Sequence, residues 1–171
     1  MKPWLLAAAA LAAALILLRG APHGGRRLEA RVVRPVDGDT LIASAGGRRF
    51  YVRLLGIDTP ETHRPGRPVE CGGTEASAHM RELAPPGRPI ELETDRGQDR
   101  VDRYGRLLAY VWLPGGRLIE DEQLRAGWAM SYVFDGRAVS RYSSLLASER
   151  VARSARRGVW GACGGRFHSA L

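Results

Sequence analysis

The sequence predicts a single α+β domain in which five strands form a small closed barrel and helices are inserted and appended. A chain of 171 residues has room for one domain with a real core, and hardly for two. Five short stretches combine strand-like alternation with turn residues at their ends, and three stretches carry apolar residues at helical spacing. Strands interrupted and followed by helices give the α+β order of a small barrel.

The first three strands are predicted from alternation and from the turns that separate them. In residues 28–32 apolar side chains alternate with charged ones, which indicates a strand. A second strand opens at Leu41, and Gly46-Gly47 is a hairpin signal. A third strand is expected over residues 50–55, where Gly56 interrupts it.

A long loop and the first helix follow. Residues 59–73 are rich in proline, glycine and charge, which is typical of a loop. Apolar residues then fall on one face of a helix over residues 74–84, with Thr74 as the expected N-cap. Alternation returns in residues 90–94 and predicts a half-buried fourth strand.

The last third of the chain contains the fifth strand and two more helices. The apolar run 107–113 follows a charged loop and predicts the fifth strand. A short helix is expected over residues 119–126, with Gly127 just beyond its end. The final helix is expected from Ala138 toward Gly158 because its apolar residues recur at helical spacing.

Residues 1–27 are interpreted as a targeting leader plus a linker, and residues 28–171 as the folded domain. Lys2 precedes an unbroken apolar run over residues 4–18, which as a helix would span ~22 Å against a hydrocarbon core of ~30 Å. That length favours a cleaved signal peptide, but no clean small-residue cleavage site follows, so an uncleaved membrane anchor through residues 4–18 is the alternative. Either reading predicts a protein that is secreted or held on the outer face of the cytoplasmic membrane.

The charge of the chain favours a polyanionic partner. Its formal net charge is +8, and the chain stays basic without Lys2 and Arg19, which lie in the leader. A positive surface attracts nucleic acid or an anionic membrane. Genome composition is the competing explanation, because arginine fills every basic position after Lys2.

Two cysteines, Cys71 and Cys163, agree with export because an even count permits one disulfide in an oxidising compartment. Two unrelated thiols are the alternative. A zinc site is not expected, since no Cys-x-x-Cys occurs and the histidines are scattered without ligand spacing. These are His23, His63, His79 and His168.

Four segments carry residues suited to phosphodiester chemistry, although each has an ordinary structural explanation. Asp37-Gly38 is a common turn, an arginine on a strand such as Arg53 is usually solvated, and Pro60 after Asp58-Thr59 ends a strand. Tyr104-Gly105 is also a plausible turn.

Together, these residues are more informative. Hard cations such as Ca²⁺ need several oxygen ligands, which Asp39, Asp58 and a backbone carbonyl can supply. Arginine guanidinium groups match phosphate oxygens. A nearby carboxylate such as Glu61 can orient or deprotonate a water. A metal, arginines and one free carboxylate are the parts that phosphodiester hydrolysis uses.

At these motifs the sequence closely resembles the thermonuclease (staphylococcal nuclease-like) family. The resemblance extends from about Leu28 to Trp160 and is carried by three ordered motifs. They are Val36-Asp37-Gly38-Asp39-Thr40, Arg53-Leu54-Leu55-Gly56-Ile57-Asp58-Thr59-Pro60-Glu61-Thr62 and Asp102-Arg103-Tyr104-Gly105-Arg106-Leu107. The resemblance implies a five-stranded OB-fold β-barrel with three helices, which agrees with the strands and helices predicted above.

The resemblance also implies roles for individual residues. Asp39, Asp58 and the Thr59 carbonyl would bind Ca²⁺, and Arg53 and Arg106 would be catalytic groups that bind the scissile phosphate and stabilise its growing charge. Glu61 would assist the attacking water, as general base or as orienter. Substrate-binding positions are then expected at Arg103, Tyr104 and Tyr132, whereas Phe134 stands where some members have a second tyrosine.

The implied activity is calcium-dependent hydrolysis of DNA and RNA by a monomer that leaves 3′-phosphate products. A non-catalytic OB-fold nucleic-acid-binding module is the alternative, but such barrels typically lose the acidic and arginine positions that this chain retains.

One geometric requirement follows from the proposed site. Arg53 and Asp58 are an odd number of residues apart, so an ideal strand would point them to opposite faces. A bulge or bend at Gly56 is predicted to re-aim the chain.

Overall fold

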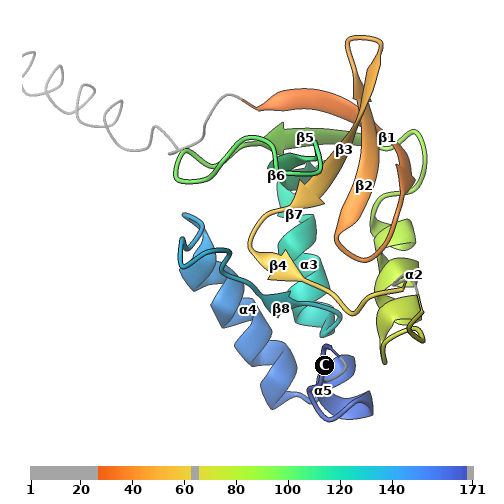
Figure 1. Cartoon of the computed structure of the whole chain (residues 1–171), viewed down its shortest axis with the longest axis vertical. Coiled ribbons are helices and arrows are strands. Elements are labelled where there is room, and N and C mark those ends of the chain that lie inside the picture. The colour runs from red at the N-terminus through yellow and green to blue at the C-terminus, as the bar shows by residue number, and fades with distance from the viewer. Residues whose placement is uncertain (1–26, 63–65, 169–171) are drawn as a thin grey trace, which may run out of the picture.

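The computed structural model describes residues 27–62 and 66–168, which form a strongly twisted sheet with helices on one side (Figure 1). The strands are β1 (Leu28–Pro35), β2 (Thr40–Ala45), β3 (Arg48–Leu54), β4 (Ile57–Asp58), β5 (Pro89–Glu93), β6 (Leu107–Leu113), β7 (Arg117–Leu118) and β8 (Met130–Ser131). The helices are α2 (Gly73–Leu83), α3 (Ile119–Ala126), α4 (Tyr142–Ser154) and α5 (Val159–Ala162).

The main sheet closes on itself and confirms the predicted five-stranded barrel. Its strand order is β3-β2-β1-β5-β6-β7 with antiparallel neighbours, and a parallel pairing of β3 with β6 closes the ring. In that closing ladder Val52, Arg53 and Leu54 lie opposite residues 107–109. This closed mixed barrel with appended helices is the OB-fold α+β arrangement.

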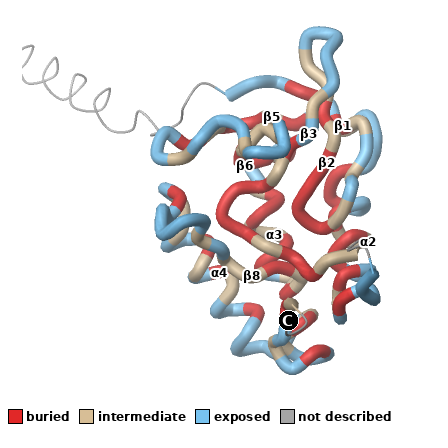
Figure 2. Tube along the Cα trace, in the orientation of Figure 1, coloured by how far each residue is buried: buried red, intermediate tan, exposed pale blue. Residues whose placement is uncertain are grey.

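Alternation along the strands fills the barrel. Figure 2 shows buried residues along the strands and in α3, while many residues of α4 are exposed. The fully or almost fully buried large side chains of the strands include Leu41, Val52, Leu54, Leu92 and Tyr110. At ~25 cal/mol per Å² of apolar surface, burial of such side chains is the dominant stabilising contribution to the barrel.

α3 is the helix against which α2 and α4 pack. It contacts β6 on one side and α4 on the other, with Leu124 fully buried, and α2 touches both α3 and β1. Its end is the predicted one, because Gly127 adopts a left-handed φ of 80° and its amide donates to the Leu124 carbonyl. A Cβ at Gly127 would meet the Arg157 carbonyl oxygen at 2.3 Å, so no other residue fits there without a backbone shift.

Two helix starts predicted from the sequence were wrong. α2 begins at Gly73 after Gly72, which has a φ of 87° and whose carbonyl accepts a hydrogen bond from the Ala76 amide, so Thr74 lies inside the helix and is not its cap. α4 begins only at Tyr142. The backbone around Ala138 is outside the helix, and the Ala138 carbonyl accepts a hydrogen bond from Gln98 instead.

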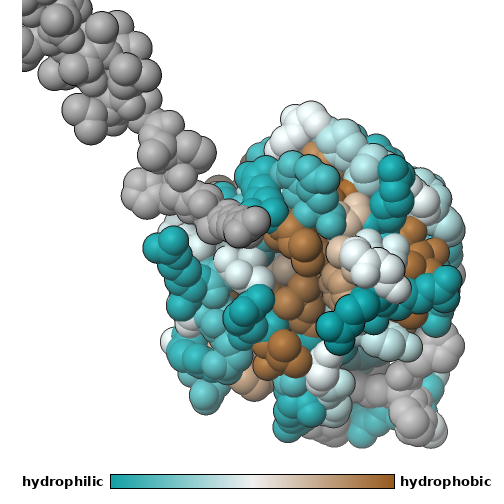
Figure 3. Space-filling view, turned by 90° about the horizontal axis from the view of Figure 1, so that it is seen from above, coloured by the Kyte–Doolittle hydropathy of each residue, from teal (hydrophilic) through white to brown (hydrophobic). Residues whose placement is uncertain are grey.

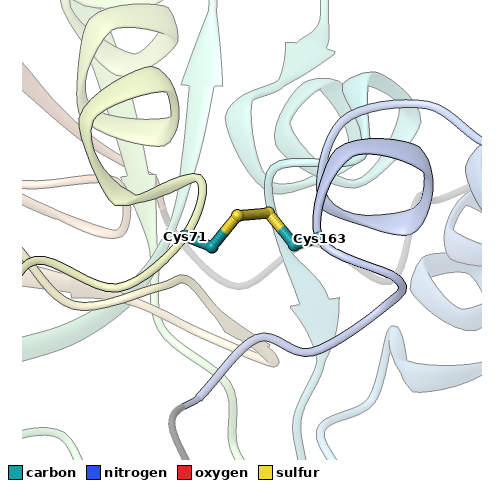
Figure 4. The surroundings of a disulfide bond; sticks show 2 residues. All are labelled: Cys71 and Cys163. Atoms are coloured by element: carbon teal, nitrogen blue, oxygen red, sulfur yellow. A yellow bond between two sulfur atoms is a disulfide. The ribbon is translucent and has the colours of Figure 1, made fainter.

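The predicted disulfide is present. Cys71, just before α2, bonds to Cys163, just after α5, and the two Cα atoms lie 6.0 Å apart (Figure 4). Around it lies a second small apolar cluster, separate from the barrel core, in which Phe167 packs edge-on against Trp160 with ring centroids 4.9 Å apart. The other members of this cluster are Val159, Cys163, Trp128 and Met130.

The face of the molecule seen from above carries both hydrophilic and apolar side chains. Seen from above, teal side chains surround a narrow apolar strip (Figure 3). Within residues 27–62 and 66–168, no helix is long and apolar enough to cross a membrane. The predicted signal peptide or anchor over residues 4–18 lies outside the described residues, and its fate stays a prediction.

Candidate active site

A turn at Gly56 changes the side of the sheet to which the following side chains point, as predicted from the sequence. β3 ends at Leu54, a turn occupies Leu55 and Gly56, and β4 starts at Ile57. Gly56 has a φ of 74°, and a Cβ there would meet side-chain carbons of Leu145 and Val139 at 2.7 Å. The turn thus needs glycine, and it brings Asp58 back to the side of the sheet on which Arg53 lies.

The turn after β1 places Asp39 next to Thr59. The Asp39 carboxylate is buried and accepts hydrogen bonds from the Thr59 amide at 3.1 Å and the Thr59 hydroxyl at 3.0 Å. Gly38 permits this approach, because a Cβ there would lie 2.7 Å from the Thr59 hydroxyl and 2.9 Å from the Ala76 Cβ. The Asp-Gly-Asp turn is therefore part of the packed site and not a solvent-exposed turn.

Arg53 connects the two aspartates. Its Nη2 lies 2.8 Å from Oδ1 of Asp58 and 3.2 Å from Oδ2 of Asp39. Its Nη1 donates to the carbonyls of Leu54 and Ile57 at 3.0 Å each. With these contacts, the guanidinium is fixed at the point where the two carboxylates converge.

Burial and neighbouring charges shift the pKa values of several groups in this cluster. Burial, then the charge of Asp39, raises the pKa of Asp37 to about 7. Burial likewise raises the pKa of Asp58, although the Arg53 guanidinium opposes the shift. Burial on its own would lower the pKa of Arg53, but the charges of Asp39 and Asp58 outweigh it and raise that pKa. Such a cluster favours a cation at its centre.

The donor set suits a hard divalent cation. Asp39 and Asp58 present oxygen donors only, and because burial raises the pKa of Asp58, a cation beside this carboxylate would favour its charged form. Across the described parts of the chain, no group of three or more His, Cys, Asp or Glu side chains is placed to hold an ion by itself. Two carboxylates leave the other coordination positions to a backbone carbonyl such as that of Thr59, to water or to substrate.

Glu61 lies close to the same cluster. It is half-buried, its backbone amide donates to Oε2 of Glu70 at 2.8 Å, and its charge contributes to the raised pKa of Arg53. The candidate water-activating carboxylate is therefore within electrostatic reach of the guanidinium that would bind phosphate.

Arg106 approaches from the start of β6 and is held by Asp102. Its Nε donates to Oδ2 of Asp102 at 2.7 Å, and its backbone amide donates to Oδ1 of the same residue at 2.9 Å. The guanidinium carbon lies 5.4 Å from the ring centre of Tyr104, and that of Arg103 lies 4.8 Å from it. Tyr104 is largely exposed, so its ring can also receive a nucleotide.

One cavity of about 370 Å³ brings most of the predicted site together. The predicted residues that line it are Arg53, Asp58, Arg103, Tyr104, Arg106 and Tyr132, and Phe134 lines it as well. Asp39, Thr59 and Glu61 do not line the cavity, but Asp39 contacts Arg53 directly and Thr59 through Asp39. The geometry is a cationic pocket beside a carboxylate cluster, flanked by exposed aromatic rings.

The sequence analysis missed two residues at the edge of this site. His168 places Nε2 3.0 Å from Oδ2 of Asp58 and Nδ1 2.9 Å from Oε2 of Glu70, which is buried. No local pattern marks either residue, because only the tertiary fold brings His168 to Asp58 and Glu70 to His168. The bond between Cys71 and Cys163 was the available signal that residues near these cysteines lie close together.

Comparisons with known proteins show the family to which the chain belongs. Residues 51–162 match the family described as Staphylococcal nuclease homologue. The chain is 35% identical over 150 residues to Endonuclease YncB of Bacillus subtilis (strain 168), covering 85% of this chain and 69% of that protein. It is 33% identical over 131 residues to the Thermonuclease of Staphylococcus hyicus, covering 76% of this chain and 74% of that protein. The match to SPbeta prophage-derived endonuclease YokF of Bacillus subtilis (strain 168) is 39% over 129 residues, 74% of this chain and 42% of that protein.

Proposed function

Because this chain belongs to the staphylococcal nuclease family and is a nuclease, we propose that it hydrolyses phosphodiester bonds of DNA and RNA with Ca²⁺ and leaves 3′-phosphate products. The observation that supports the proposal best is the convergence of Asp39 and Asp58 on Arg53 beside the cavity that Arg106 lines.

The metal is assigned to the carboxylate cluster. Asp39, Asp58 and the Thr59 carbonyl would hold the ion, with water and substrate completing a shell of loose geometry that suits Ca²⁺ better than the strict octahedron of Mg²⁺. When bound, the ion supplies stabilisation of negative charge on the phosphate.

The arginines and Glu61 carry out the remaining steps. Arg53 and Arg106 bind the scissile phosphate from two sides and stabilise the charge that grows as water attacks phosphorus. Glu61 takes up a proton from that water, or orients it for attack. The bond to the 5′ oxygen breaks, that oxygen takes a proton from solvent water, and the phosphate stays on the 3′ side.

Substrate is held next to these groups. Arg103, Tyr104 and Tyr132 would contact the neighbouring phosphate and base, since aromatic faces stack on any base. We place the protein, as a monomer, outside the cytoplasm, either secreted or anchored on the outer face of the cytoplasmic membrane. The apolar run over residues 4–18 and the Cys71–Cys163 bond support this location.

A cleavage assay on plasmid DNA and on end-labelled DNA and RNA oligonucleotides tests the proposal, with Ca²⁺, with Mg²⁺ alone and with EGTA. We expect cleavage with Ca²⁺ only, and 3′-phosphate ends by end-group analysis. Asp39→Asn should raise the Ca²⁺ concentration needed, whereas Glu82→Gln, an exposed carboxylate on α2, should not. Full activity in EGTA would refute the metal assignment, and binding without cleavage would favour a non-catalytic module.

A further inference from the structure

The segment after α5 returns to the candidate metal site. Phe167 is only 3% exposed and sits in the small apolar cluster around Cys163, so the segment is anchored by both a bond and a buried ring. The next residue, His168, then lies between Asp58 and Glu70 with ring nitrogens 3.0 and 2.9 Å from their carboxylate oxygens.

This placement links the metal site to the loop that carries Glu61. Oε2 of Glu70 accepts from the Glu61 amide at 2.8 Å and contacts the His168 ring at 2.9 Å. The other ring nitrogen contacts Oδ2 of Asp58, while Oδ1 of Asp58 is held by Arg53. Both Asp58 oxygens are thus oriented, one by a strand residue and one by the anchored segment.

We propose that His168 is a positioning residue of the metal site, which orients Asp58 for the cation and is kept there by the Cys71–Cys163 bond and Phe167. This inference rests on the proposed function. Residues that orient metal ligands typically contribute 10- to 100-fold to metal affinity. The disulfide would then set metal affinity as well as stability, and the nuclease would bind its ion fully only where the bond can form.

Calorimetric titration with Ca²⁺ alone tests this role without any cleavage reaction. We expect His168→Ala to weaken Ca²⁺ binding by about 10-fold or more, and His168→Gln, which keeps a donor for Asp58, to recover part of the loss. Arg166→Ala, an exposed change in the same segment, is the matched control and should bind Ca²⁺ like the wild type. Circular dichroism and thermal unfolding establish that each variant is folded.

A double-mutant cycle separates positioning from general stabilisation. If the bond acts through His168, replacing both cysteines by serine should weaken Ca²⁺ binding, and adding His168→Ala should weaken it little further. Fully additive losses, or wild-type affinity in folded His168→Ala, would overturn the inference. If the variants give these outcomes while the wild-type protein cleaves nucleic acid, the role of His168 is refuted and the proposed function stays intact. If the wild-type protein neither binds Ca²⁺ nor cleaves nucleic acid, the proposed function itself is refuted.

A second, independent observation concerns the outer face of β1, β2 and β3. Arg53, Tyr51 and Arg49 alternate along β3 with buried Val52, so they project to one face. Across the ladder, Ile42 lies opposite both Tyr51 and Arg34, and Ser44 lies opposite both Arg49 and Arg31. The register shift between Val32 and Arg34 is what lets Arg31 and Arg34 share this face although they are three residues apart.

Beyond Arg53, which pairs with Asp39 and Asp58, the arginines of this face have no acidic partner in the described part of the chain. Arg31 and Arg34 donate only to the carbonyls of Gly87 and Pro35, and among the described residues neither they nor Arg49 form an ion pair. Tyr51 between them is 47% exposed. An exposed row of unpaired guanidinium groups with an interleaved aromatic ring fits a single-stranded polynucleotide.

We infer that this face binds the part of a single-stranded substrate that extends beyond the scissile phosphate at Arg53. The inference deepens the proposed function. Residues two apart in a strand are separated by roughly 6.8 Å. Tyr51 therefore lies one such spacing from Arg53 along β3, and Arg49 lies two spacings from it.

The salt dependence of binding provides the test. Glu61→Gln protein is titrated with a fluorescent single-stranded 12-mer in EGTA at several salt concentrations. Each of Arg31→Ala, Arg34→Ala and Arg49→Ala should reduce the slope of log affinity against log salt by about 0.7. Tyr51→Ala should weaken binding at every salt concentration without changing the slope. Arg150→Ala on α4 is the exposed control. If the slopes and affinities are unchanged in all four variants while the wild-type protein cleaves nucleic acid, binding by this face is refuted and the proposed function is not.

Discussion

Replacing both Cys71 and Cys163 by serine should lower the free energy of unfolding by an amount that the structure allows us to work out. The bond joins residues 92 positions apart, and the chain-entropy relation for a loop of that length gives about 4–5 kcal/mol as an upper value. For a chain of this size the loss corresponds to a fall in Tm of roughly 10–15 °C. The barrel core contains neither cysteine and is expected to remain, so the folded state should persist at 25 °C.

Urea unfolding of the double variant, measured by fluorescence and by circular dichroism, gives this free energy directly. The wild-type protein under reducing and non-reducing conditions is the control, because it removes the bond without changing the sequence. The two comparisons should agree. A loss below about 1 kcal/mol in both, relative to the 4–5 kcal/mol of the entropy relation, would show that the unfolded chain is not restrained by this bond and would refute the reasoning.

Four further changes test the site and the fold. Arg106→Ala should slow turnover by ~10²-fold or more at unchanged Tm, with Arg106→Lys restoring little, because a point charge cannot replace the planar fork; activity within a few-fold of wild type would place the phosphate contact elsewhere. Glu61→Gln should cost at least ~10²-fold in turnover if the carboxylate takes the proton, and less if it only orients water. Gly38→Ala should lower Tm and activity together, since its Cβ would press on Thr59; a wild-type Tm would contradict this packing. Burial raises the pKa of Glu120, on α3, from 4.5 to about 8. Its contribution to the free energy of unfolding is therefore full below pH 4.5 and is lost as pH rises through 8. Glu120→Gln should flatten the fall of Tm between these two pH values, and an unchanged Tm profile would refute the raised pKa.

The barrel was predictable because each of its strands carries a local signal. Alternation in residues 28–32 and 90–94 follows from burial of one face, and the glycines at 46–47 and 56 have the positive φ values that their turns need. The two-residue strands β4, β7 and β8 and the four-residue helix α5 were not predicted, since elements that short show no period.

Site residues in local motifs were predictable from the sequence, whereas those that only the tertiary fold brings together were not. Asp39, Arg53 and Asp58 were predicted because they stand in motifs next to turns that position them locally. Thr74 was expected to cap α2 because threonine is a good cap, but Gly72 supplies a left-handed residue that starts the helix without a side-chain hydrogen bond. His168 lies 110 positions from Asp58, and only the long-range fold brings them together.

Closure of the barrel by the pairing of β3 with β6 also has a consequence for solubility. Open sheets present unpaired amides and carbonyls that recruit strands from other molecules. Here the long strands β3 and β6 are paired with each other, and the outermost strand of this sheet is β7, which has two residues and begins with Arg117. Such a short, charged border offers little template for intermolecular strand addition, so concentrated folded protein should resist fibril and aggregate formation.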